Sequence, residues 1–371
     1  MSWIFIDTIT TFVLSVALVA VLRRLTVALA LVDRPDSVRK RHKGVIPLCG
    51  GMAIFIAFAS VVLFGRAPSV LGLDFWLGLA VIIIVGVVDD RHPLPAVARL
   101  LAQLGAAVLI VGGMQIGSLS IGVFFATNAV LMTPFFFVIG IIFVTGLVNA
   151  WNMLDGIDGL GGGCAAVALA WLIVIASFGS LPDIIPPLET LLVAVCAFLV
   201  FNMRSPWRQR ASIFLGDAGS TALGMTIAYA VLLIATQSTA VSFPALLWVV
   251  IVPVADTLSL MVRRFAAGRS PMSADRWHMH HLLLDHGLST AAATNTLIIA
   301  SAICGAIGYL GIRAQVPGEI MAIGLVVPIA LHTAFMLVAT GYVTRRALPA
   351  KGRSIETEPE TFGGAAADAE A

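Results

Sequence analysis

The chain has 371 residues, of which 59% are hydrophobic and only 11% are charged; its formal net charge is +2. Soluble domains carry about 25% charged residues, so this composition nearly excludes a soluble globular protein. The small net charge says little about partners, and the sequence contains no nucleic-acid-binding motif.

Eleven apolar stretches are candidates for membrane-spanning helices, since one span needs roughly 20 mainly apolar residues. They are centred near residues 14, 55, 80, 105, 139, 169, 195, 227, 252, 302 and 329. The third, at 73–88, is short. The first lacks a small-residue cleavage site and is followed by many others, which favours a retained helix over a removed signal peptide. The sequence therefore predicts an all-α polytopic membrane protein with about eleven transmembrane helices.

Basic residues indicate the orientation of these spans. Arg and Lys gather in each connection that follows an odd-numbered span, except the connection after the fifth. The positive-inside rule places such connections in the cytoplasm. We therefore expect the N-terminus outside and the C-terminus inside.

Acidic residues gather on the same predicted side. Asp89 and Asp90 end the third span, Asp155 and Asp158 follow the fifth, and Asp217 opens the eighth. Carboxylates at membrane level usually face a water-filled cavity or bind a cation. Several of them beside a basic rim suit Mg²⁺, which prefers oxygen ligands and shares its shell with substrate phosphates.

Glycines accompany these acids in "DGIDGLGGG" (155–163) and "LGDAGS" (215–220). Because glycine lacks Cβ, its N–H group can approach phosphate oxygens closely, and both clusters are predicted to start helices, whose N-termini favour anions. Close helix packing by small residues is the alternative. We favour a phosphate-and-metal site, because packing gives no reason for the adjacent acids.

A loop after the ninth span, "ADRWHMHHLL" (274–283), contains Arg276, His278, His280 and His281. The H-x-H-H pattern lacks the cysteines or second ligand set of a zinc site. Histidine and arginine can instead donate hydrogen bonds to a diphosphate. A solvated loop without function is the alternative. We expect His332, within the last span, to be incidental.

Four patterns in this order carry a family resemblance. They are "DDxxxL" at 89–94, "NxxNxxDGxDGL" at 149–160, "FLGDxGS" at 214–220 and "HxHH" at 278–281. Together, over roughly residues 33–290, they resemble the polyprenyl-phosphate N-acetylhexosamine-1-phosphate transferases. The segment "VDRPDSVRKRHKGVIPLCGG" (32–51) and the histidine loop are most similar to bacterial undecaprenyl-phosphate GlcNAc-1-phosphate transferases that begin O-antigen, enterobacterial common antigen or teichoic-acid linkage synthesis. The muramoyl-pentapeptide branch has a different histidine loop.

The resemblance implies an enzyme of the bacterial inner (cytoplasmic) membrane with its active site facing the cytoplasm. Such an enzyme transfers GlcNAc-1-phosphate from UDP-GlcNAc to undecaprenyl phosphate and releases UMP, with Mg²⁺ as cofactor and Mn²⁺ as a substitute. Because two anionic phosphates must meet, a cation has to screen their repulsion. The expected partners are these two substrates and membrane lipid. A homodimer with a second copy of the chain stays open.

Two alternatives stay open at this point. One is the same chemistry with another UDP-N-acetylhexosamine donor, including UDP-MurNAc-pentapeptide. The other is a cation-coupled membrane transporter, although transporters tend to place ionisable groups near the bilayer midplane in duplicated halves. Here the acids lie at one edge, and no internal repeat is visible.

The resemblance also implies roles for single residues. The implied metal ligands are Asp217, Asn152 and Asp90. The implied catalytic residues are Asp89, Asp90, Asp155 and Asp158. The implied substrate contacts are Asn149, Asn152, Arg99, Arg276, His278, His280 and His281.

Adjacent helical residues diverge by about 100°, so Asp89 and Asp90 are expected to have separate roles. We expect Asp89 to act on the lipid phosphate and Asp90 on the metal or its surroundings, in an order that could be reversed. Direct attack by the lipid phosphate and an aspartyl-nucleotide intermediate both stay open.

Residues 1–346 are predicted to form a single membrane domain. The alternating stretch 114–125 predicts a short periplasmic β-hairpin. Residues 347–371, rich in Ala, Glu and Gly, predict a disordered cytoplasmic tail.

Overall fold

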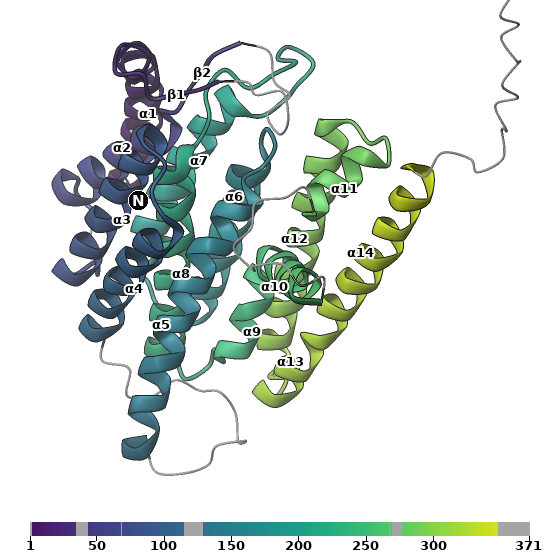
Figure 1. Ribbon diagram of the computed structural model, residues 1–371. Coiled ribbons are helices and arrows are strands. Elements are labelled where there is room, and N and C mark those ends of the chain that lie inside the picture. The colour runs from purple at the N-terminus through teal and green to yellow at the C-terminus, as the bar shows by residue number, and fades with distance from the viewer. Residues whose placement is uncertain are drawn as a thin grey trace, which may run out of the picture.

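The computed structural model describes residues 2–34, 44–67, 69–114, 129–266, 268 and 277–347. For residues 2–4, 129–134 and 341–347 it describes the backbone alone. The described residues form a bundle of helices with one two-stranded sheet, which confirms the predicted all-α class (Figure 1). The main helices are α1 (Ser2–Ala28), α2 (Gly50–Phe64), α3 (Leu73–Arg91), α4 (Ala96–Gly113), α5 (Ala129–Leu154), α6 (Leu160–Phe178), α7 (Ile185–Asn202), α8 (Gly216–Gln237), α9 (Phe243–Leu247), α10 (Ile251–Ala266), α11 (Met279–Asp285), α12 (Thr290–Arg313), α13 (Gly318–Gly324) and α14 (Val326–Ala347).

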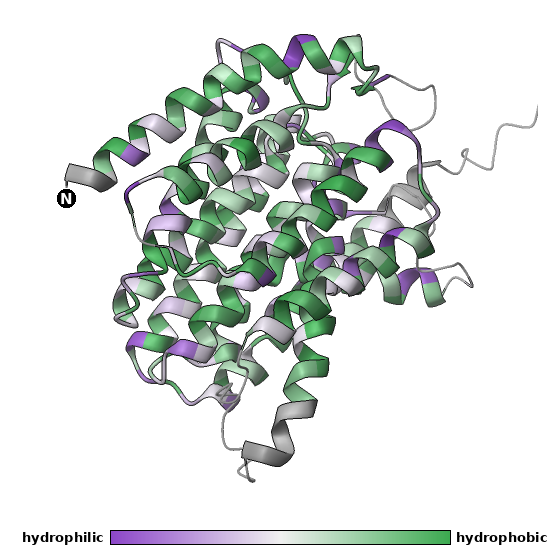
Figure 2. Ribbon diagram, turned by 90° about the vertical axis from the view of Figure 1, so that its left-hand side faces the viewer, coloured by the Kyte–Doolittle hydropathy of each residue, from purple (hydrophilic) through white to green (hydrophobic). Residues whose placement is uncertain are grey.

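Apolar side chains cover most of the helical surface, as Figure 2 shows in green. Among the described residues, nine helical segments are long and apolar enough to cross a membrane. The two other predicted spans are also helical: α2 is a shorter apolar helix, and α3 carries Asp74, Asp89 and Asp90. Lipid offers no hydrogen-bond partner to the backbone, so a helix is the form in which each apolar segment can cross. The chain is a multi-pass membrane protein.

Helix α8 lies at the centre of the bundle, and every residue from Ala218 to Ala235 is buried. Its neighbours approach through small residues. A Cβ at Gly51 of α2 would overlap the backbone of Gly219, and a Cβ at Gly86 of α3 would overlap the backbone of Ala218. Gly219 therefore serves close helix packing, as small residues do in membranes, and the phosphate approach predicted for its cluster stays a prediction.

Two of the predicted spans are interrupted. The ninth consists of α9, a short 3-10 helix at Trp248–Val250 (η2) and α10, and the last consists of α13 and α14. Figure 1 shows α10 almost end-on, whereas α5, α6 and α14 run up the page. Helix α10 therefore crosses the direction of the bundle, and it packs against both α5 and α14.

The connection from α1 to α2 contains a small antiparallel sheet that the sequence did not predict. Strand β1 (Val32–Asp33) pairs with β2 (Ile46–Pro47). Beyond β2 the chain runs beside the segment that precedes α8: Phe214 donates its N–H to Pro47 O at 2.9 Å, and Gly50 returns one to Phe214 O at 2.9 Å. The stretch "IPLCGG" is thus tied to "FLGD". Apart from residue 114, the predicted hairpin lies outside the described residues, and so do residues 348–371 of the predicted tail.

Candidate active site

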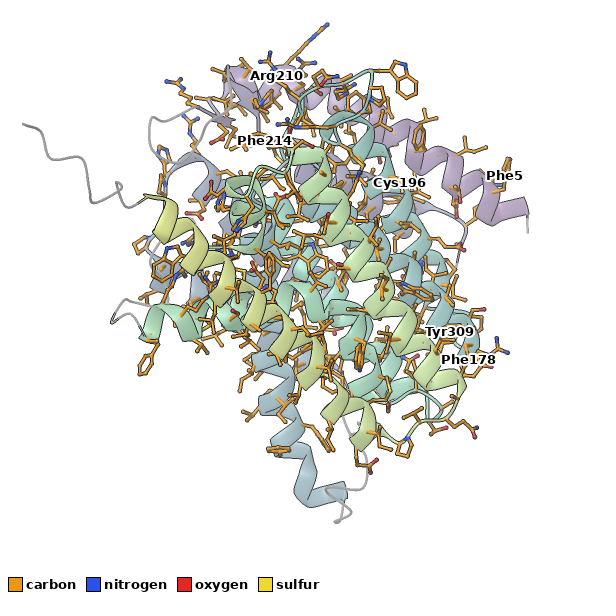
Figure 3. All side chains as sticks on the ribbon, turned by 90° about the vertical axis from the view of Figure 1, so that its right-hand side faces the viewer. Phe5, Phe178, Cys196, Arg210, Phe214 and Tyr309 are labelled. Carbon is orange, nitrogen blue, oxygen red and sulfur yellow. The ribbon has the colours of Figure 1, made fainter. Side chains whose placement is uncertain are left out.

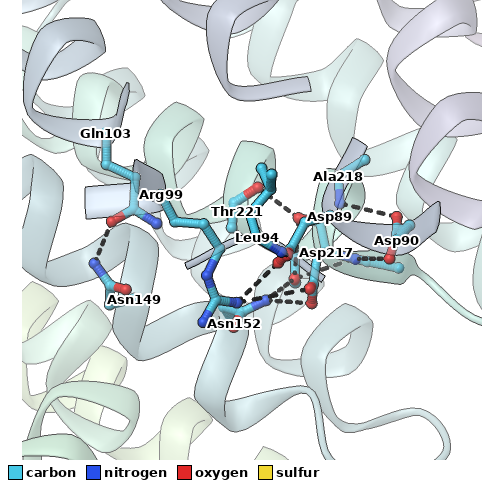
Figure 4. A network of polar contacts seen from close by, with 12 residues as sticks. Asp89, Asp90, Leu94, Arg99, Gln103, Asn149, Asn152, Asp217, Ala218 and Thr221 are labelled. Carbon is cyan, nitrogen blue, oxygen red and sulfur yellow. Dashed lines mark hydrogen bonds and ion pairs between the residues drawn. The ribbon is translucent and has the colours of Figure 1, made fainter. Parts of the chain in front are cut away.

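The five predicted aspartates converge at one end of the bundle, where α3 and α5 finish and α6 and α8 begin. Figure 4 shows Asp89, Asp90 and Asp217 side by side. Asp155, in the connection from α5 to α6, is close enough to interact electrostatically with both Asp217 and Asp158. The convergence predicted from the sequence is confirmed.

Asp89 forms an ion pair with Arg99. Its carboxylate accepts a hydrogen bond from Arg99 Nη1 at 2.8 Å and another from the Leu94 N–H at 2.7 Å. The same Arg99 nitrogen lies 4.0 Å from Asp217 Oδ2, and the carboxyl groups of Asp89 and Asp217 contact each other directly. One guanidinium therefore serves two acids, an arrangement that a bound cation would stabilise further.

Asp90 points the other way and holds the start of α8. Its two carboxylate oxygens accept the N–H groups of Asp217 at 2.8 Å and Ala218 at 3.3 Å. Gly216 has φ +76°, and a Cβ there would overlap the Asp90 carboxylate. The α8 N-terminus, which was predicted to attract phosphate, is thus occupied by a carboxylate of the protein itself. The separate directions predicted for Asp89 and Asp90 are confirmed.

Asn152 orients Asp217. Its side-chain amide donates to Asp217 Oδ1 at 2.8 Å and to the Ser220 hydroxyl at 2.9 Å. Asn149, one turn earlier on α5, donates instead to Gln103 of α4 at 2.6 Å (Figure 4). Gln103 is buried. The sequence did not predict it as a site residue, because a single amide in an apolar helix forms no motif.

The loop 155–159 is fastened by its acids. Asp158 accepts hydrogen bonds from Arg204 Nε at 2.7 Å and from the Ala211 N–H at 3.1 Å, both in the connection from α7 to α8. Asp155 faces Gly161 in the first turn of α6. Loss of hydration and the negative charge of Asp217 raise the pKa of Asp155 to about 7.

Residues 278–281, here called the histidine segment, pack against this loop. A Cβ at Gly156 would overlap the His280 ring. His278 does not point outward, because its Nδ1 lies 2.8 Å from Asp256 Oδ2. His332 Nε2 lies 3.3 Å from the other oxygen of Asp256, so His332 has a buried acidic partner that the sequence did not predict. Arg276 lies outside the described residues.

Neither Asp256 nor His332 was among the predicted site residues. An acid inside an apolar span is itself a signal of function, and Asp256 could have been found that way. His332 sits in a different span with no neighbouring motif, so only the fold pairs it with Asp256.

Within the described ranges, no three His, Cys, Asp or Glu side chains are grouped so as to hold a metal ion by themselves. The side chain of Asp217 is nevertheless 39% exposed, with the Asp89 carboxyl beside it, and Asn152 turns its amide nitrogen toward Asp217. Two neighbouring carboxylates fit Mg²⁺, which usually keeps several waters and takes one or two carboxylates together with substrate phosphates.

Comparisons with known proteins identify the family of this chain. Residues 73–235 match the model of a family described as glycosyl transferase family 4. The chain is 32% identical over 309 residues to the undecaprenyl-phosphate alpha-N-acetylglucosaminyl 1-phosphate transferase of Yersinia pestis, which covers 81% of this chain and 82% of the relative. The protein of the same name from Escherichia coli (strain K12) is 31% identical over 311 residues, 82% of this chain and 83% of the relative. A protein from Bacillus subtilis (strain 168), named a probable undecaprenyl-phosphate N-acetylglucosaminyl 1-phosphate transferase, is 31% identical over 274 residues, 72% of this chain and 74% of the relative.

The family match, over residues 73–235, covers all five aspartates. The similarity to the Yersinia pestis protein extends beyond this range, to 81% of this chain and 82% of the relative. With the membrane bundle and the aspartates gathered at one of its ends, the chain belongs to the family of polyprenyl-phosphate N-acetylhexosamine-1-phosphate transferases.

Proposed function

We propose that this protein transfers GlcNAc-1-phosphate from UDP-GlcNAc to undecaprenyl phosphate, giving GlcNAc-diphosphoryl-undecaprenol and UMP. The observation that carries the proposal is the meeting of Asp89, Arg99 and Asp217, from three helices, at one end of a membrane bundle. The names of relatives about 31–32% identical over most of the chain support the two substrates. A cation-coupled transporter is not favoured, because the acids gather at one end of the bundle and the relatives are named as transferases.

Asp217 is the first metal ligand in this proposal, and the Asn152 side chain orients it. Mg²⁺, when bound, screens the repulsion between the two phosphates and stabilises the charge on the departing UMP. Asp90 supports Asp217 by holding the first turn of α8.

Asp89 and Arg99 act on the lipid phosphate. Both oxygens of Asp89 already accept hydrogen bonds, which makes this carboxylate a poor nucleophile. We therefore assign Asp89 to orienting Arg99, whose guanidinium contacts the lipid phosphate while that phosphate attacks the donor directly. A phosphate monoester is largely ionised near neutral pH, so it needs little help from a base.

The donor lies over the loop 155–159 and the histidine segment. Asp155 borders its diphosphate, Asp158 faces its nucleoside, and His278 and His281 contact phosphate oxygens. Both ring nitrogens of His280 are buried, so His280 packs against Gly156 in place of the phosphate contact predicted for it. In this proposal the active site lies on the cytoplasmic side of the inner membrane, and the reaction begins a cell-surface glycan pathway.

Purified protein in detergent tests the proposal with a donor panel of UDP-GlcNAc, UDP-GalNAc and UDP-MurNAc-pentapeptide. We expect UMP release with UDP-GlcNAc that requires both Mg²⁺ and undecaprenyl phosphate, with Mn²⁺ as a weaker substitute. If only UDP-MurNAc-pentapeptide gave UMP release, it would be the donor in place of UDP-GlcNAc. If no donor gave UMP release, the proposed reaction would be overturned.

A further inference from the structure

The buried carboxylate of Asp256 has no assigned part in the proposed reaction, although it contacts His278, which has one. Asp256 lies on α10 and is 3% exposed. His278 Nδ1 lies 2.8 Å from Oδ2, and the Met279 N–H donates to Oδ1 at 3.0 Å. His332 of α14 lies 3.3 Å from Oδ1. A buried charge needs such partners, so all three contacts stabilise the ionised carboxylate.

These contacts fix the first residues of α11. His278 is the N-cap residue of that helix and Met279 its first residue, yet the oxygen that accepts the Met279 N–H comes from α10. A second residue of α10, Arg263, donates to Trp277 O at 2.7 Å. Helix α10 therefore contacts three consecutive residues, 277–279, and sets where the histidine segment begins.

His280 connects His278 to the aspartate site. The two rings are stacked, with centroids 5.5 Å apart and planes inclined by 10°. His280 is 1% exposed and lies against Gly156, the residue after Asp155. Tightly packed side chains transmit small shifts, so a displaced His278 ring would displace its neighbours.

The contact with Asp256 also selects which nitrogen of His278 can meet a ligand. An ionised carboxylate only accepts hydrogen bonds, so the proton on Nδ1 points at Asp256. Nε2 is then the ring atom that can donate a hydrogen bond to a phosphate, once the ring carries its second proton. A carboxylate that fixes the ring orientation and proton position of a ligand-binding histidine is a familiar arrangement in metal sites.

We propose that Asp256 is a positioning residue for the nucleotide donor. By holding His278 Nδ1 and the start of α11, with His332 as its second partner, it sets the orientation in which the histidine segment meets the diphosphate. This role rests on the proposed function, because it takes the histidines as donor contacts.

The variant Asp256→Asn tests this role. The asparagine amide has one acceptor oxygen and one NH₂ donor, whereas His278 and Met279 contact two different oxygens of Asp256. The asparagine side chain therefore cannot replace both contacts. We expect the Kd for UDP-GlcNAc, measured by calorimetry with Mg²⁺ present, and the KM for UDP-GlcNAc to rise about 10–100-fold. The KM for undecaprenyl phosphate and the unfolding temperature should stay within error of the wild type. The matched control is Thr257→Val, the next residue on α10, whose buried hydroxyl has no hydrogen-bond partner among the described atoms.

A double-mutant cycle with His278→Ala separates positioning from an independent structural effect. Once the ring is absent, Asp256→Asn should weaken donor binding by less than about twofold further. Losses that multiply in the double variant would overturn the proposal, and so would an unchanged Kd in Asp256→Asn.

Two further measurements keep the outcomes distinct. If Asp256→Asn does not fold, His332→Gln should still raise the donor Kd by up to about fivefold, because it removes the ion-pair partner of Asp256 Oδ1. An unchanged Kd would count against the cluster. Donor binding that depends on Asp256 in a wild-type protein without transferase activity would overturn the proposed reaction and uphold the positioning role.

Discussion

Asp217 is the residue on which the proposed chemistry depends most. It contacts Asp89, lies near Arg99 and accepts a hydrogen bond from Asn152, so it links three other predicted site residues. In Asp217→Asn the charge that binds the metal is gone, although the shape of the side chain is kept. We expect turnover to fall by at least about 10²-fold and not to recover at high Mg²⁺. UMP release measured from 1 to 100 times the Mg²⁺ that saturates the wild type checks this, with exposed Asp183→Asn as the control for a lost charge. Recovery of activity at high Mg²⁺ would show that Asp217 adds affinity only.

Asp155 gives a prediction in pH. Its pKa is about 7 in the folded protein, whereas an aspartate in water has an ordinary pKa of 3.8. As the pH rises from 4 to 7, the unfolded chain ionises this group readily and the folded chain resists ionisation, so the folded state loses stability over that window and the loss levels off above pH 7. Asp155→Asn cannot ionise. Its unfolding temperature, measured in detergent with EDTA, should exceed that of the wild type by an amount that grows between pH 5 and pH 7. A difference that is the same at every pH would mean that the Asp155 carboxyl does not titrate in this range.

At the scale of helices, the site depends on how closely α2, α3 and α8 approach. The close contact of Gly51 with Gly219 brings "IPLCGG" beside "FLGD", and Asp90 then reaches the first turn of α8. Contacts between residues far apart in sequence therefore place Asp217.

Gly219→Ala tests this packing. The added methyl group would meet Gly51 Cα and the Leu215 side chain, so the helices must separate by a few tenths of an ångström or more. We expect destabilisation of about 1–3 kcal/mol, the range seen when packed cores are overfilled, and reduced transferase activity, because Asp217 is two residues away. Thermal unfolding in detergent measures the first effect. Gly146→Ala on α5 is the matched control, since nothing lies within 4 Å of a Cβ there; equal behaviour of the two variants would exclude a packing role for Gly219.

Other helices join the site through polar side chains on connections. Asp158 bonds Arg204 in the connection from α7 to α8, and its carbonyl oxygen accepts a hydrogen bond from Thr294 of α12. Figure 3 shows α12 and α14 from the side opposite to α1. The histidine segment is held from this side, by α10 and α14, and the aspartates from the other.

At the scale of the whole molecule, the two ends of the bundle differ in chemistry. The acid end carries the connection from α7 to α8, with Trp207 93% exposed and Arg210 also exposed. Aromatic and basic side chains of this kind sit at membrane interfaces. Thr239, in the connection from α8 to α9, is exposed at the opposite end.

These two positions test the proposed orientation. Trp207→Cys and Thr239→Cys would be made in a background in which the four native cysteines, Cys49, Cys164, Cys196 and Cys304, are replaced. A membrane-impermeant maleimide should label residue 207 in inverted vesicles and residue 239 in right-side-out cells. The reverse pattern would place the active site outside.

The sequence by itself determined the fold class, because lipid imposes long apolar helices, and these can be read from composition alone. It also indicated the five aspartates that gather at one end of the bundle, because charged groups are costly in a membrane and stand out against the apolar background. Asp89, Asp90, Asp155, Asp158 and Asp217 were found in that way.

Only the tertiary structure decided how each polar group is used. Asp90 became a partner of the α8 N-terminus and Asp158 a partner of Arg204, since each carboxylate binds the donor that folding brings nearest. Gly219 became a packing contact because Gly51 lies opposite it. His332 joined Asp256 because α10 crosses the bundle toward α14. No local pattern encodes such pairings, because they depend on distances between segments that are separated along the chain.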